Sequence, residues 1–350
     1  MAELYEIELR GSSRQRGLQH GRQLTTSIQR AVDFYRAFFK EHIGLDTATI
    51  RQRAAHFIEP TAQISPLLMD EYEGIAEGSG QSLEDIFALS ARYEITFEAV
   101  ALGECSNLFV GPQRSRDGHV LLGQNWDWRP EVMDFRAVFT ARCDDLPDHI
   151  MVTECGQPGK YGLNASGLGI AEAGLNCRSK ASIGPHLFVA IGRAILACDT
   201  LDAAAAIIEQ FPPYATVNFL LADEQGQAVN FEATPVGIFR KDLPTEQIFW
   251  HTNHCLQADE PTDFENSLAR GHRWTELTST PDTVTPQMAQ AWLADRGLQQ
   301  HNICQLPDPA LAATPTWLQT LCSIVMDLNQ RTLWVSDGPS CQFPYREYQL

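Results

Sequence analysis

The sequence predicts an α+β fold in which helices cover antiparallel sheets. Hydrophobic residues recur at helical spacing from Ser13 to about Glu98, and at Cys105 the pattern changes to short strands separated by turns. Helices are expected again further along, at 186–211, 264–279 and 285–296. Helices and strands gathered in separate stretches are typical of layered α+β proteins.

The first part of the chain is expected to begin with a strand and to continue as helices. Residues 4–10 alternate between apolar and polar side chains, which predicts a strand. Ile28, Val32 and Tyr35 then fall on one face of a helix. Ser82 precedes two acidic residues, a pattern that predicts the start of another helix.

Beyond Cys105, alternation and turn residues predict the strands. The expected strands are 106–111, 118–124, 136–142, 149–154, 168–174, 215–222, 227–233, 236–240 and 247–252, with a hairpin at 323–335. The loop at 255–266 is the most linker-like stretch, but it is too short to separate domains. We therefore expect residues 1–350 to form a single domain.

The charge and the hydropathy of the chain exclude several classes of partner. The formal net charge is −18, which disfavours nucleic acid and anionic membranes because both are negative. No apolar run approaches the roughly 20 residues that span a bilayer. The N-terminus lacks the pattern of a signal peptide, and the nine cysteines are an odd number with loose spacing. We therefore expect a cytoplasmic protein with reduced thiols, while a homo-oligomer stays open.

Cys105 is the strongest candidate for a nucleophile. It lies in Gly103-Glu104-Cys105-Ser106-Asn107, a polar break between the helical part and the first strand after it. A thiol attacks as thiolate and needs a base. If the chain is cut before Cys105, the new α-amine can supply that base. The alternative is a buried structural cysteine, which describes most cysteines.

The surroundings of Cys105 resemble a known family. Glu104-Cys105-Ser106, followed by a segment over 117–128 that ends in Gln124-Asn125-Trp126-Asp127-Trp128, closely resembles the isopenicillin N acyltransferase (acyl-CoA:6-aminopenicillanate acyltransferase) family of self-processing N-terminal-nucleophile hydrolases. Weaker matches lie at 8–12, 16–21, 252–254 and 323–328.

This resemblance implies a four-layer αββα N-terminal-nucleophile hydrolase fold and a precursor that cleaves itself between Glu104 and Cys105. The expected products are an α fragment, 1–104, and a β fragment, 105–350, which stay together. The fungal acyltransferase that typifies the family has glycine before its cysteine, whereas this chain has Glu104. A bulky anion at the scissile carbonyl is expected to slow the first attack.

The resemblance also assigns supporting residues. Asp127 matches the aspartate that holds the α-ammonium of the nucleophile, and Asn253 matches the asparagine that donates to the oxyanion. Asn176 resembles a second asparagine at the oxyanion site of the related choloylglycine hydrolases. An arginine should also act on the nucleophile, and the sequence does not choose among Arg270, Arg273 and Arg331. A solvated helix face is the expected place of the first two.

The sequence gives weaker support for other kinds of functional site. Trp126 and Trp128 are expected to pack in the core. The residues His251, His254, Cys255, His301 and Cys304 lack paired zinc spacing, so we expect no metal. Phosphate-loop and dinucleotide motifs are absent from the sequence, and no cofactor is implied.

The sequence therefore predicts an amidohydrolase or acyltransferase that acts on a small N-acyl amide through an acyl-enzyme on Cys105. Two alternatives stay open. One is an intact, non-catalytic scaffold or ligand-binding protein of the same fold. The other is a cysteine hydrolase that is not cut and uses His119 or His254 as its base.

Overall fold

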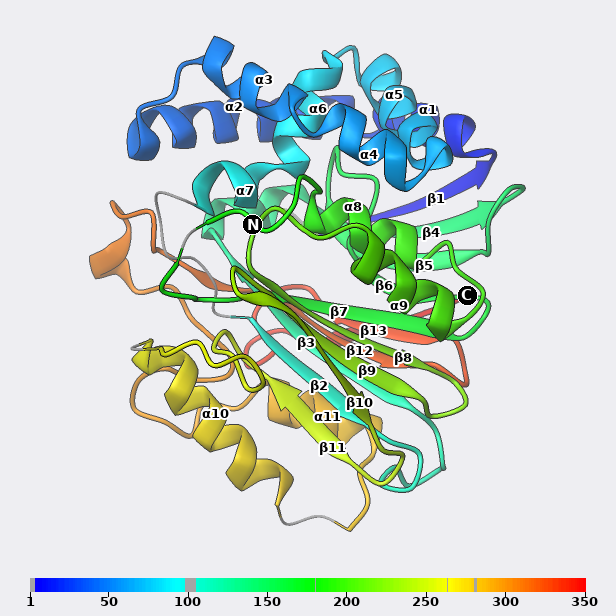
Figure 1. Cartoon of the computed structure of the whole chain (residues 1–350), viewed down its shortest axis with the longest axis vertical. Helices are drawn as coiled ribbons and strands as arrows, with labels where there is room; N and C mark the ends of the chain where they lie inside the picture. The colour runs from blue at the N-terminus through cyan, green and yellow to red at the C-terminus, as the bar shows by residue number, and fades with distance from the viewer. Residues whose placement is uncertain (1–3, 98–104, 180, 263, 280–281) are drawn as a thin grey trace.

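The computed structural model describes residues 4–97, 105–179, 181–262, 264–279 and 282–350. Two sheets lie face to face, and helices cover the outer face of each (Figure 1). The order of layers is helix, sheet, sheet, helix, so the predicted four-layer αββα fold of the N-terminal-nucleophile hydrolases is confirmed. In the part of the chain that is described, no helix is both long and apolar enough to cross a bilayer.

The N-terminal helices build the outer layer of the first sheet. They are α1 (Ser13–Gln23), α2 (Thr25–Ile43), α3 (Thr47–Ala55), α4 (Ile58–Ile64), α5 (Pro66–Ser79), α6 (Leu83–Ser90) and α7 (Arg92–Phe97). Ser82 caps α6 as predicted, because its side chain accepts from the backbone NH of Asp85. Two later helices, α8 (Phe188–Ile195) and α9 (Leu201–Gln210), lie in the same layer.

The first sheet has the strand order β1-β4-β5-β6-β7-β8-β9-β10. Its strands are β1 (Tyr5–Gly11), β4 (Arg136–Cys143), β5 (His149–Glu154), β6 (Tyr161–Asn164), β7 (Leu168–Gly174), β8 (Val217–Asp223), β9 (Ala228–Thr234) and β10 (Gly237–Leu243). The pairs are antiparallel except that β1 runs parallel to β4. The purely antiparallel sheet that the sequence predicted is corrected at this edge, where the long excursion through α1–α7 brings the chain back in the same direction.

The second sheet has the order β11-β2-β3-β12-β13-β14. Its strands are β11 (Ile248–His251), β2 (Ser106–Val110), β3 (Leu121–Trp128), β12 (Gln319–Asp327), β13 (Thr332–Ser336) and β14 (Tyr345–Gln349). Helices α10 (Glu265–Thr278) and α11 (Pro286–Leu293) cover its outer face through a small apolar cluster that includes Leu108, Trp274 and Leu293. Two short 3-10 helices lie at Pro130–Phe135 and Pro309–Leu311.

Buried amides tie the two sheets together. The side chain of Gln124 on β3 donates to the carbonyl of Glu172 on β7 at 2.8 Å and accepts from its NH at 3.0 Å. Asn107 on β2 donates to Asn218 on β8 at 2.9 Å. Because a buried amide needs partners, these bridges define how one sheet lies on the other.

One local expectation is corrected, and two short strands were not predicted. The helix expected over 186–211 is broken: Asn164 donates to the carbonyls of Leu196 and Cys198 at the end of α8, and Thr200 caps α9. Strand β6 is short and contains Gly162, so no alternation marked it. Edge strand β14 is mostly polar, so no alternation of apolar and polar residues predicted it. The hairpin expected over 323–335 is confirmed by β12 and β13.

Helices α1 and α5 approach so closely that glycine is required at their contact. A Cβ on Gly17 would lie 2.2 Å from the carbonyl oxygen of Glu71, and one on Gly74 would lie 2.6 Å from that of Arg14. Gly21 and Gly78 repeat this contact one turn on. The Arg16-Gly17-Leu18-Gln19-His20-Gly21 segment therefore has a packing role.

We predict that Gly17→Ala lowers the free energy of unfolding by about 2–3 kcal/mol, because backbone cannot move aside as a side chain can. Gly44→Ala is the control: Gly44 has open space around a Cβ but a φ of +76°, so a loss of only about 1 kcal/mol is expected. Chemical denaturation measures both. Equal losses would contradict the close contact of the two helices.

Candidate active site

Cys105 directly precedes β2 and borders a small buried cavity. The residue is 7% exposed, and its Sγ lies 3.8 Å from the carbonyl oxygen of Asp127 on β3. The cavity has a volume of about 30 Å³. Its walls are formed by Arg92, Tyr93, Cys105, Trp126, Asp127, Trp128, Lys160, Tyr161, Glu172, Gly174 and Phe188. Glu104, the expected partner at the scissile bond, lies outside the described residues.

The thiol of Cys105 is protonated at neutral pH in this environment. Burial raises its pKa to about 11, and the charge of Asp127 adds to the rise. Lys160 and Arg270 act in the opposite direction, as does the backbone hydrogen bond to Asp127. A base must therefore remove the proton before this sulfur can attack.

Arg270 connects the head of β2 to the loop after β11. Its Nη1 donates to the carbonyl oxygen of Cys105 at 2.8 Å and to Oγ of Ser106 at 3.0 Å. Its Nη2 donates to Oδ1 of Asn253 at 2.5 Å, and Nε donates to Oδ1 of Asn266 at 2.7 Å. The residue is 0% exposed, so the expected solvated face of α10 is wrong at this position.

The other two candidate arginines are engaged elsewhere. Arg273, on the same helix, pairs with Asp295 at 2.7 Å and with Glu276 at 2.9 Å. Arg331 pairs with Glu224 at 2.8 Å. Among the three, Arg270 is the arginine at Cys105.

The two asparagines predicted from the sequence lie next to each other. The backbone NH of Asn176 donates to the carbonyl oxygen of Asn253 at 2.8 Å. Nδ2 of Asn253 donates to the carbonyl oxygen of Gly174, which borders the cavity, at 2.8 Å. Nδ2 of Asn176 is buried and has no hydrogen-bond acceptor among the described residues. Neither asparagine borders the cavity itself.

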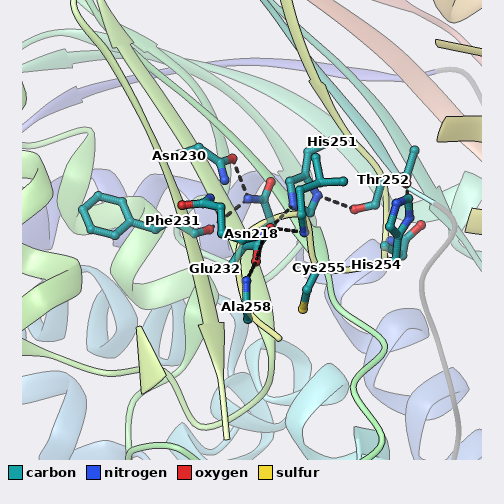
Figure 2. Close-up of polar contacts among 12 residues, drawn as sticks. Asn218, Asn230, Phe231, Glu232, His251, Thr252, His254, Cys255 and Ala258 are labelled. Atoms are coloured by element: carbon teal, nitrogen blue, oxygen red, sulfur yellow. Dashed lines mark hydrogen bonds and ion pairs between the residues drawn. The ribbon is translucent and has the colours of Figure 1, made fainter. Parts of the chain in front are cut away.

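A buried carboxylate anchors the loop that carries Asn253, as Figure 2 shows. Glu232 on β9 accepts from the backbone NH groups of Leu256, Gln257 and Ala258 and from Nε2 of His251 at 2.8 Å. Burial alone would raise the pKa of Glu232, but these donors lower it below the ordinary value. The loop after β11 is thus held to β9 at both ends.

Asp127 and the two tryptophans beside it all border the cavity. The Trp126 ring packs on Tyr161 at a centroid distance of 5.9 Å, and Nε1 of Trp128 donates to the hydroxyl of Tyr35 at 3.0 Å. Both rings belong to the main core, as predicted.

The histidines considered as bases have other partners. His119 lies 2.8 Å from Oδ2 of Asp327, and Nδ1 of His254 lies 2.8 Å from Oγ of Ser267. Burial lowers the pKa of His254 to about 4. Neither histidine borders the cavity at the thiol.

The sequence reasoning missed three ionisable residues of the cavity: Arg92, Lys160 and Glu172. Arg92 pairs with Glu154 at 2.6 Å and lies over the Trp128 ring. Glu172 is the one acid inside β7, between small and apolar residues. An acid in a strand that is buried along its length was the signal that could have found it.

The comparisons with known proteins confirm the predicted family. Residues 114–339, more than half of the chain, match the family described as acyl-coenzyme A:6-aminopenicillanic acid acyl-transferase. The chain therefore has the αββα fold of the N-terminal-nucleophile hydrolases and belongs to the acyl-coenzyme A:6-aminopenicillanic acid acyl-transferase family. The matched range includes Asp127, Asn176 and Asn253 and begins after Cys105.

A curated relative from Emericella nidulans is the acyl-coenzyme A:6-aminopenicillanic-acid-acyltransferase 40 kDa form. It is 24% identical over 295 residues, which cover 83% of this chain and 81% of the relative. Similar solved structures include the Caenorhabditis elegans ortholog of N-acylethanolamine-hydrolyzing acid amidase (TM-score 0.49, 12% identity, 70% of this chain and 100% of that one). Another is penicillin V acylase from Agrobacterium tumefaciens (TM-score 0.41, 16% identity, 66% of this chain and 82% of that one).

We predict that Arg270→Met lowers the free energy of unfolding by about 3 kcal/mol or more, because several buried acceptors lose their donor at once. Arg273→Met is the matched control on the same helix, with an expected change within about 1 kcal/mol, since its ion pairs are partly exposed. Denaturant unfolding measures the free energy of unfolding of both variants. A loss at Arg270 no larger than that at Arg273 would contradict the network.

Proposed function

We propose that the chain is a self-cleaving cysteine N-terminal-nucleophile amidohydrolase or acyltransferase that acts on a small N-acyl amide. It is made as one domain and is cut between Glu104 and Cys105 into fragments 1–104 and 105–350. One observation carries the proposal: the Arg270 guanidinium binds both the head of β2 at Cys105 and the side chain of Asn253. The family's name describes transfer of an acyl group from a thioester to an amine, which supports the same class of reaction.

Cleavage begins when the Cys105 sulfur attacks the carbonyl carbon of Glu104. The carbon–nitrogen bond breaks, a thioester forms, and water hydrolyses it. Cys105 then carries a free α-amine, whose ordinary pKa near 8 allows a neutral fraction at physiological pH. That amine can take the thiol proton in each later turnover.

In turnover, the thiol attacks the carbonyl carbon of the substrate amide. Side-chain NH groups of Asn253 and Asn176 donate to the oxyanion, and Asp127 holds the α-ammonium of Cys105. The α-ammonium passes its proton to the leaving amine as the carbon–nitrogen bond breaks. Water then hydrolyses the acyl-enzyme, or an amine accepts the acyl group. A reducing, cytoplasmic setting keeps the thiol available.

The cavity of the intact chain has room for about one water molecule, so a substrate requires a wider site. Arg92 and Tyr93 form part of its wall and lie on α7, near the new C-terminus that cleavage would create on the α fragment. We expect the site to widen after the bond at Cys105 breaks.

We predict that the wild-type chain gives fragments of 104 and 246 residues on a denaturing gel, whereas Cys105→Ala gives one chain of 350 residues. Cys143→Ala, at a thiol that does not border the cavity, is the control and should be cleaved normally. An intact wild-type chain without activity would favour the non-catalytic scaffold. An intact chain with thiol-dependent activity would favour a histidine base.

We predict that Asn253→Ala is cleaved but turns over substrate about 100- to 1000-fold more slowly, because one oxyanion donor is lost. Formation of the acylated β fragment, followed by intact mass over a series of N-acyl amino acids and amine amides, measures the rate. Turnover equal to that of the wild type would remove the role assigned to Asn253.

A further inference from the structure

Lys160 and Glu172 have no role in the mechanism above, yet both border the cavity at the thiol. Lys160 directly precedes β6, and Glu172 lies on the neighbouring strand β7. Each is 1% exposed. Two buried ionisable groups beside a nucleophile point to a chemical task, because burial of charge costs free energy.

The contacts of Lys160 leave its amine available. Nζ lies 4.1 Å from the centroid of the Trp126 ring and 4.5 Å from that of Tyr161. Within the described part of the chain, Nζ forms these two ring contacts and no hydrogen bond. An amine held by rings can gain or lose a proton without breaking a hydrogen bond.

Glu172 is fixed through its backbone and open at its carboxyl group. Gln124 binds both its NH and its carbonyl oxygen, as described above. Its two carboxyl oxygens are buried, with no hydrogen-bond partner among the described residues. A Cβ on Gly192 of α8 would lie 2.0 Å from Oε1, so glycine makes the room for this carboxyl group.

The first cleavage needs a base that the mature mechanism does not supply. Before the chain is cut, the nitrogen of Cys105 belongs to a peptide bond and has no basic lone pair. Arg92 cannot act, since a guanidinium keeps its proton in proteins. An aspartate carboxylate is in general a much weaker base than an amine.

We propose that Lys160, which borders the same cavity as Glu172, is the base that takes the proton of the Cys105 thiol in the self-cleaving attack. This inference rests on the proposed function. The cavity has room for about one water molecule, so the proton moves directly or through one water. The burial of Lys160 supports the role, because it lowers the pKa of the amine to about 7, with the charge of Arg92 acting in the same direction.

The neutral amine of Lys160 accepts the proton from Sγ, and the sulfur forms a bond to the carbonyl carbon of Glu104. The carbon–nitrogen bond breaks, and the Lys160 ammonium returns its proton to the departing nitrogen, which becomes the α-amine of Cys105. The Glu172 carboxyl group borders the same cavity, and its charge favours the ammonium form of Lys160, while burial raises the pKa of Glu172 itself well above the ordinary value.

The test follows conversion of the full chain in a cell-free translation pulse-chase, resolved on denaturing gels. Lys160→Met and Lys160→Arg are both expected to cleave about 100-fold more slowly than the wild type, because neither can accept a proton at neutral pH. Lys241→Met, at an exposed lysine on β10, is the matched control and should cleave normally. Methylamine should restore cleavage of Lys160→Ala, which only a folded variant permits.

Cleavage of Lys160→Met at the wild-type rate would overturn the proposal, and so would normal cleavage of Lys160→Arg, which would show that a fixed charge suffices. Hydroxylamine gives an independent reading, because it cuts a thioester. Rapid cutting of Lys160→Met at Cys105 by hydroxylamine would show that the thioester forms without Lys160. A wild-type chain that is never cut would instead overturn the proposed function.

Discussion

The site depends on one buried guanidinium. Arg270 binds the carbonyl oxygen of Cys105 and the hydroxyl of Ser106, which lie far from α10 in the sequence, and also the side chain of Asn253 in the loop after β11. A guanidinium presents its donors in a fixed planar fork, so one side chain sets both the position and the direction of its acceptors. Lysine could not do the same. The thiol residue and the proposed oxyanion donor are thus placed relative to each other by α10.

The rest of the site relies on polar contacts between the two sheets. The Gln124 side chain forms two hydrogen bonds with the backbone of Glu172, and Asn107 donates to Asn218. A shift of one sheet over the other would leave these buried amides without hydrogen-bond partners, which costs free energy. Cys105 lies at the end of β2 where these contacts begin. The Glu232 carboxylate then anchors the loop after β11, which brings Asn253 under Arg270.

Much of the fold could be predicted from the sequence because local periodicity marks it. The change from helical to strand spacing falls at Cys105, and the hairpin of β12 and β13 has a clear turn. Strand β6 could not be predicted, since glycine interrupts a very short segment. The parallel pairing of β1 with β4 joins residues far apart in the chain, and no local pattern encodes it.

The candidate site, like the fold, could be predicted from the sequence only in part. Cys105 and Asp127 stand in motifs that the sequence displays, but the choice of Arg270 over Arg273 depends on which face of α10 is buried. Glu172 lies on β7 and Lys160 directly precedes β6, both in the first sheet, so their place beside Cys105 follows from the stacking of two sheets.

The most direct test of the account is whether the active protein carries a cysteine with a free amine at its end. An aldehyde that closes a thiazolidine ring on a 1,2-aminothiol, followed by intact mass, detects this group alone. We predict that one label appears on a fragment of 246 residues beginning Cys105-Ser106-Asn107. Active protein that takes no label, or that carries the label nowhere in this fragment, would contradict the account.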